Sequence, residues 1–92
     1  MADFDNVWER IQQCAGQTFT TVTGLPFTYR VPGAHLCVSR DGREINRSPS
    51  RTNFARAATA MPATRPSDLR EMQGSAYTWA ILMDKRVRQA DW

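Results

Sequence analysis

The stretch FTYRVPGAHLCVS, residues 27–39, alternates apolar and polar side chains on both sides of a proline–glycine pair. In its first half Phe27, Tyr29 and Val31 share one face, as the period of two in a β-strand requires. The pair at 32–33 is typical of a tight turn, because proline presets the first central torsion and glycine accepts the positive φ of the second. We therefore predict two antiparallel strands joined by a short turn.

A third strand is predicted upstream at TFTTVT, residues 18–23, where β-branched and aromatic residues are dense. The sequence Gly-Leu-Pro at 24–26 ends this run. Downstream, the Asp-Gly pair at 41–42 is the next turn signal, and a short extended segment over 44–47 leads towards the next helix with Ile45 facing inward. The sequence thus predicts a three-stranded antiparallel meander.

Helices are predicted on both sides of this meander. Residues 4–15 carry an apolar stripe at helical spacing. Ser48 and Pro49 begin a second helix that extends to residue 61, since serine can cap a helix and proline fits its first turn. A short helical segment over 67–72 follows.

The last predicted helix, residues 76–87, is apolar almost all the way round. Such a helix lies in the centre of a small fold rather than on its surface. The predicted fold class is therefore α+β, with an N-terminal helix, a three-stranded antiparallel meander, and then two or three helices of which the last is buried. We expect the core to contain Phe19 or Val22, together with Phe27, Tyr29, Leu36, Val38, Phe54, Met61, Trp79, Ile81 and Leu82.

The composition fits one domain over residues 1–92. A hydrophobic content of 41% and a charged content of 23% are globular values, so we do not expect a disordered chain. No apolar run approaches the roughly 20 residues that span a bilayer, and the acidic N-terminal sequence differs from a secretory signal. Two cysteines outside any metal-binding spacing favour reduced thiols and a cytoplasmic location.

We expect no catalysis, cofactor, metal site or small-molecule substrate. The single histidine, His35, has no nucleophile elbow to act with, and no dinucleotide-binding, P-loop or zinc-protease motif occurs. Cys37 would share a strand face with His35, but neither further metal ligands nor an orienting group accompany the pair. The sequence therefore favours a binding module over an enzyme.

The excess positive charge lies in the middle of the chain. Residues 40–70 contain seven arginines against three acidic residues. A guanidinium can hold a phosphate bidentately, a helix N-terminus attracts anions, and an asparagine such as Asn53 can read adenine. Nucleic acid, with DNA first, is thus the leading partner. The predicted contacts are Arg40, Arg43, Arg47, Ser48, Ser50, Arg51, Asn53 and Arg56.

Two alternatives to nucleic-acid binding stay open. The arginines can form only the solvated surface of the domain. The chain can also be a protein-interaction or self-associating module that uses apolar surface, with Trp92 and Phe4 as candidate contacts. Salt separates these hypotheses, because binding through phosphates weakens steeply with salt and binding through apolar surface changes little.

Three motifs together resemble those of a short bacterial domain of uncharacterised function. They are TGLPFTY at 23–29, INRSPSRTNF at 45–54 and GSAYTWAILMDKR at 74–86. The resemblance covers most of the chain from Phe19 onward. It implies a recurring compact domain of bacterial or phage origin, and it implies no activity.

Overall fold

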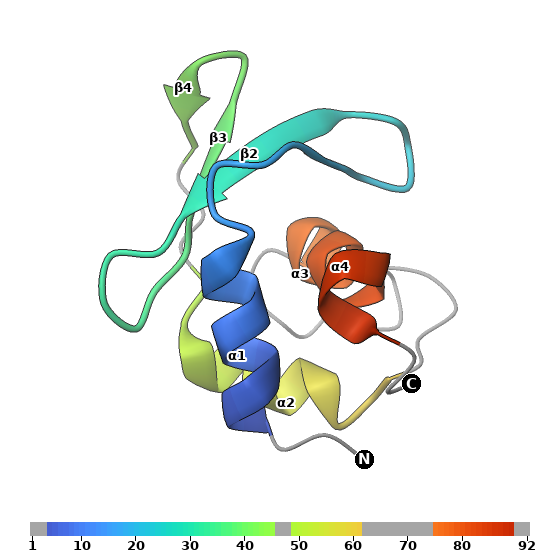
Figure 1. Cartoon of the computed structure of the whole chain (residues 1–92). Helices are drawn as coiled ribbons and strands as arrows, with labels where there is room; N and C mark the ends of the chain where they lie inside the picture. Colours follow the sequence, from blue (N-terminus) through green and yellow to red (C-terminus); the bar gives the residue numbers. More distant parts are fainter. Residues whose placement is uncertain (1–3, 46–48, 62–74, 90–92) are drawn as a thin grey trace.

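The computed structural model describes residues 4–45, 49–61 and 75–89, and Figure 1 shows their arrangement. Within these ranges the order of elements confirms the predicted α+β class, with an N-terminal helix, an antiparallel sheet and further helices. In chain order the described elements are α1 (Phe4–Gln13), β1 (Phe19–Thr20), β2 (Pro26–Arg30), β3 (Cys37–Arg40), β4 (Arg43–Glu44), α2 (Arg51–Ala58), α3 (Ser75–Met83) and α4 (Lys85–Arg88).

The sheet has four antiparallel strands in the order β1-β2-β3-β4, one more than predicted. The additional strand arises from the Asp41–Gly42 turn, whose residues both have positive φ, 53° and 78°. Such torsions are typical of the two-residue turns that match the twist of a hairpin. Because the turn is this short, Arg43 lies directly opposite Arg40. The predicted turn is confirmed, and the extended segment after it begins earlier than predicted and pairs with β3 as β4.

The connection from β2 to β3 is longer than the predicted tight turn. Gly33 does adopt a positive φ of 76°, but β3 begins only at Cys37. Residues of this connection pair instead with the chain just before and at the start of α2: the Leu36 amide donates to the Pro49 carbonyl over 2.9 Å. The Arg51 amide donates to the Ala34 carbonyl over 2.8 Å. These two hydrogen bonds join the base of the β3–β4 hairpin to α2.

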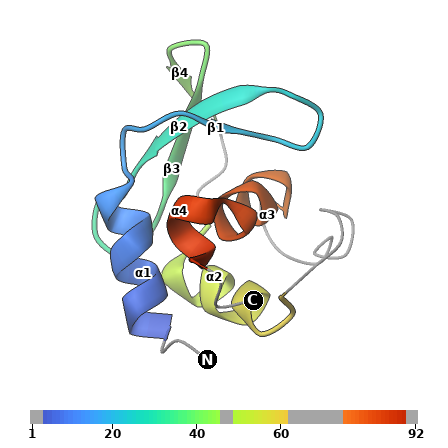
Figure 2. The same ribbon diagram turned by 45° about the vertical axis from the view of Figure 1, so that its right-hand side comes forward.

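All the described helices lie on one face of the sheet, as Figures 1 and 2 show. The inward residues of β2, Phe27 and Tyr29, meet the helices because strand side chains alternate between faces. Val22, one of two alternatives for the core, is 59% exposed, whereas Phe19 is buried. Met61 and Trp79 are partly buried. The fully buried hydrophobic side chains include Ile11, Phe19, Leu36, Val38, Phe54, Ile81, Leu82 and Val87.

The last predicted helix is two helices in the structure. Asp84 interrupts it with an extended backbone (φ −70°, ψ 138°), and its side chain accepts a hydrogen bond from the Arg86 amide, so that it caps α4. This is the ordinary preference of aspartate for a helix start. The predicted burial of the apolar helix is confirmed, since Tyr77, Ile81 and other residues of α3 are buried. The predicted segment 67–72 lies outside the described residues.

Arg86 fastens α4 to the segment between α1 and the sheet. Its guanidinium holds both carboxylate oxygens of Asp84, at 2.9 and 3.0 Å. It also donates to Gln17 Oε1 over 2.8 Å and to the Thr18 carbonyl over 2.9 Å, and it lies 4.0 Å from the centre of the Phe19 ring. The hydrogen bond from Arg86 lowers the pKa of Asp84 below its ordinary value. We call this group the Arg86 clamp.

Tyr29 fastens β2 to the C-terminal end of α1. Its buried hydroxyl donates to the Ile11 carbonyl over 2.6 Å, and its own carbonyl accepts from the Gly16 amide over 2.9 Å. A helix end leaves its last carbonyls without partners inside the helix, so the tyrosine completes α1. Burial raises the pKa of Tyr29 well above its ordinary value.

Candidate nucleic-acid interface

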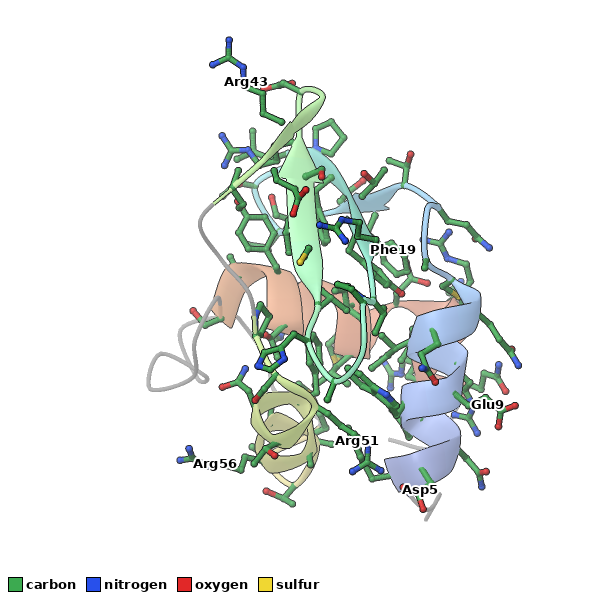
Figure 3. The ribbon with its side chains drawn as sticks, turned by 90° about the vertical axis from the view of Figure 1, so that its left-hand side faces the viewer. Asp5, Glu9, Phe19, Arg43, Arg51 and Arg56 are labelled. Atoms are coloured by element: carbon green, nitrogen blue, oxygen red, sulfur yellow. The ribbon has the colours of Figure 1, made fainter. Side chains whose placement is uncertain are left out.

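The hairpin of β3 and β4, residues 37–44, presents two arginines on one face, and we call it the arginine hairpin. Arg40 and Arg43 are directly opposite each other across the strand pair, so their side chains leave from the same face. Arg43 is exposed at the tip, as Figure 3 shows, and forms no ion pair with any described residue. Like charges placed opposite each other destabilise a strand pair unless an anion joins them.

Arg40 is held in place by a hydrogen bond to a residue of α3. Its Nη1 donates to the hydroxyl of Tyr77 in α3 over 3.0 Å, and this hydrogen bond raises the pKa of Arg40 above its ordinary value. The Tyr77 ring packs edge-on against Phe27, with centroids 5.0 Å apart. Arg40 is thus tied to α3 by one hydrogen bond, while Arg43 is free to turn towards a ligand.

The outer face of the sheet, which no described helix covers, carries a neutralised charge pair. The guanidinium of Arg30 contacts both carboxylate oxygens of Glu44, at 3.0 and 3.1 Å. By the alternation of the strands, Thr28 and Ser39 share this face. Among the described strand residues no aromatic ring points outward there, so the sheet offers no platform on which bases could stack.

The start of α2 uses its hydrogen-bond donors within the protein. The helix begins two residues later than predicted, and Ser50 rather than Ser48 is the cap: its Oγ accepts from the Asn53 amide over 3.1 Å. The reason is that Pro49 is buried and extended chain continues to Ser50, which bridges His35. The Arg51 amide is also engaged, with Ala34. Few amides therefore remain at this helix start for a phosphate.

Arg51 joins α2 to α1 rather than pointing freely into solvent. It forms an ion pair with Asp5 and lies 5.2 Å from the centre of the Phe4 ring. Figure 3 shows Arg51 and Asp5 side by side. Phe4 in turn packs against Trp8, with centroids 6.4 Å apart. Both a predicted phosphate contact and a predicted protein contact are thus engaged in helix packing.

The predicted contact residues do not form one face. Arg56 is exposed on α2, and Figure 3 places it at the opposite end of the protein from Arg43. Asn53 is half-buried on the same helix. Arg47, Ser48 and Trp92 lie outside the described residues. The structure therefore brings together Arg40 and Arg43 at one end, and Arg51, Asn53 and Arg56 along α2 at the other.

The sequence analysis missed an exposed apolar loop between β1 and β2, residues 21–25. Val22 is 59% and Leu25 is 45% exposed. The Thr21 amide donates to the Leu25 carbonyl over 2.9 Å, and the Leu25 amide donates to Thr21 Oγ1 over 3.1 Å. Since β1 has only two residues, Val22 falls in this turn and not in a strand. The two aliphatic residues beside Gly24 were the available signal.

Neither a metal site nor a membrane span is found in the described part of the chain. No three histidine, cysteine or acidic side chains gather there as metal ligands, and no helix there has the length and apolarity to cross a bilayer. Cys14 is a buried free thiol, whereas Cys37 is a free thiol that is only partly buried. Comparison of the whole chain with protein-family models, with curated proteins and with solved structures gives no match.

Proposed function

We propose that the chain is a non-enzymatic module that binds duplex nucleic acid, DNA first, through the arginine hairpin. The observation that carries this proposal is the pair Arg40 and Arg43, directly opposite each other at the end of a hairpin. Like charges placed directly opposite each other on a strand pair repel in the free protein, and backbone phosphates bound by the two arginines relieve this repulsion. The pair is therefore suited to the backbone of a nucleic acid.

The shape of the hairpin supports a duplex as the partner. A two-stranded β-ribbon fits the major groove of B-form DNA. Figures 1 and 2 show the tip of β3 and β4 extending away from the helices, to which Arg40 reaches back through Tyr77 of α3. The outer sheet face carries the Arg30–Glu44 pair and no aromatic ring, which favours a duplex over an unpaired strand.

The interface is small and electrostatic. Arg30 is engaged with Glu44 and Arg51 with Asp5, so we assign phosphate contacts only to Arg40 and Arg43. Each neutralised phosphate contributes a slope of about −0.9 in log affinity against log salt. We therefore expect weak binding with a slope of about −2, and these phosphate contacts by themselves confer little sequence preference.

The test is fluorescence anisotropy of a labelled duplex of roughly 20 base pairs, titrated at about 50 mM and about 200 mM salt. Arg43→Gln should weaken binding at low salt and reduce the slope by about 0.9. Arg56→Gln is the matched control, because it removes another exposed arginine, at the opposite end of the protein. Absence of binding by the wild type at low salt, or equal losses in the two variants, would contradict the proposal.

A protein-interaction or self-associating module is supported less well. Its candidate contact Phe4 is packed between Trp8 and Arg51, so it offers little free apolar surface. The exposed apolar side chains of the described residues are Val22 and Leu25 instead. Those two residues lie in a loop at the same end of the sheet as the arginine hairpin, and their position leads to a more specific inference.

A further inference from the structure

The β1–β2 loop and the arginine hairpin extend from the same end of the sheet. Thr28 lies opposite Ser39, which places the start of β2 beside the end of β3. The loop that precedes β2 and the turn that follows β3 therefore leave from the same end of the sheet. Figures 1 and 2 show them as two projections that diverge because the sheet is twisted. One carries Val22 and Leu25, and the other carries Arg40 and Arg43.

The loop is ordered before any ligand arrives. Besides the two hydrogen bonds between Thr21 and Leu25, the Gly24 amide donates to the Thr21 carbonyl over 2.9 Å. The hydroxyls of Thr21 and Thr23 are 3.1 Å apart and share a further hydrogen bond. Gly24 has a φ of 89°, a torsion that glycine adopts without strain. The side chains of Val22 and Leu25 are thus held in place before binding, so that ordering the loop costs little entropy when a ligand binds.

We infer that this loop supplies the apolar part of the same interface, by placing Val22 and Leu25 in the minor groove of duplex DNA. The inference rests on the proposed function. Aliphatic side chains enter the minor groove and wedge between base steps, at the edge of the phosphates that basic side chains hold. The preferred site is a flexible pyrimidine–purine step, such as TA, which opens at the lowest energy.

A second copy of the chain is a poorer occupant of this surface. A symmetric dimer pairs the same patch on both subunits, so it would bring Arg43 of one copy towards Arg43 of the other. That juxtaposition of like charges opposes association. A stable dimer also needs roughly 1,200 Å² or more of buried surface, which two partly exposed side chains cannot supply.

The test compares the wild type with the double variant Val22→Thr/Leu25→Gln. Threonine keeps the shape of valine and glutamine stays flexible, so neither change disturbs the folded core, since both side chains are exposed. We expect the variant to bind the duplex about fivefold to tenfold more weakly, because less apolar surface is buried. Its salt slope should remain that of the wild type, because the phosphate contacts are retained.

A second readout locates the wedge. With 2-aminopurine beside a central TA step, wild-type binding should raise the fluorescence as the step unstacks, and the variant should leave it unchanged. Arg43→Gln is the complementary variant: it keeps the apolar loop, and its binding should have a reduced salt slope. Duplex RNA of the same sequence should bind more weakly, because its minor groove is wide and shallow.

The outcomes separate the two proposals. Salt-dependent binding that is equal in wild type and loop variant overturns the role of the loop and leaves the arginine hairpin standing. No salt-dependent binding by the wild type overturns both. A wild-type dimer that the loop variant converts to monomer, seen by sedimentation, assigns the loop to a second copy and overturns the inference. Equal binding to duplex RNA also overturns it.

Discussion

Arg86 and Arg43 show two opposite uses of the same side chain. Arg86 is surrounded by partners: a carboxylate held at both oxygens, an amide oxygen, a backbone carbonyl and the face of Phe19. Arg43 stands at the tip of a two-residue turn, opposite Arg40 and without an ion pair to any residue that the structure describes. The first guanidinium is part of the fold, and the second is free for a ligand.

The comparison shows why the density of arginines along the chain is a weak guide to a binding surface. Between residues 40 and 56, Arg40 binds Tyr77 and Arg51 binds Asp5. Arg51 has to break its ion pair before it binds a phosphate, whereas the hydrogen bond to Tyr77 uses only Nη1 of Arg40. The following substitutions test the contrast, from the structural arginine to the exposed one.

Arg86→Ala should have the largest effect on stability. The substitution removes several hydrogen bonds and the contact with Phe19, and we expect it to lower the free energy of unfolding by about 2–3 kcal/mol. Urea denaturation followed by tryptophan fluorescence measures the loss. Lys85→Ala, at the exposed neighbouring position, is the control and should stay within about 0.5 kcal/mol of the wild type. Equal losses in both variants would show that Arg86 is not a clamp.

Acidification should narrow the stability difference between the wild type and Arg86→Ala. Arg86 lowers the pKa of Asp84, so the ionised carboxylate contributes stability at pH values above its ordinary pKa of about 3.9. That contribution is lost as the pH falls through the lowered pKa, because the native carboxylate is then protonated. Urea titrations at neutral pH and near pH 3 measure the narrowing, and a constant difference would contradict it.

Tyr29→Phe should have an intermediate effect. The variant keeps the ring in the core but removes the donor to the Ile11 carbonyl, which is buried at the end of α1. We expect a loss of about 1–2 kcal/mol in the free energy of unfolding. Tyr77→Phe is the matched control: it removes a hydroxyl whose partner, Arg40, can turn to water, so it should cost less. A larger loss in Tyr77→Phe would reverse the ranking.

Gly42→Ala should cost about 1 kcal/mol, because an L-residue is strained at the φ of 78° that the turn requires. The cost should come with weaker duplex binding, since the turn sets Arg43 opposite Arg40. Differential scanning calorimetry and anisotropy measure the two effects. Gly33→Ala, which has a φ of 76° outside the hairpin, is the control: it should lose stability without losing the salt slope of binding.

Arg43→Ala should have the smallest effect on stability, within about 0.5 kcal/mol of the wild type. Removing one of two like charges that face each other relieves repulsion, so a slight gain in the free energy of unfolding is expected at low salt. Urea denaturation at low and high salt checks this. A loss comparable to that of Arg86→Ala would show that the exposed arginine also supports the fold.

The order of elements could be predicted from the sequence because it depends on local periodicity. The alternation of Phe27 and Tyr29 and the Asp-Gly turn both act over a few residues, and both predictions are confirmed. The fourth strand and the break at Asp84 carried local signals too. A two-residue turn continues a strand ladder, and an aspartate inside an apolar helix favours a new start.

The partners of the arginines could not be predicted, because they come from distant parts of the chain. Arg86 meets Thr18, Arg40 meets Tyr77, and Arg51 meets Asp5. Each pairing depends on how helices and strands pack in three dimensions. The contact residues predicted from the sequence therefore lie on more than one face of the protein. They do not include the apolar loop between β1 and β2.

The hydrogen bonds between the β2–β3 connection and the start of α2 have a mechanical consequence. They join the segment that enters the arginine hairpin to the start of α2. The pairs are Leu36 with Pro49 and Ala34 with Arg51. A force applied at the tip is therefore shared between the β2–β3 ladder and this closure, and it does not pull on one loose end. The base of the hairpin is thus fastened to the start of α2 as well as to β2.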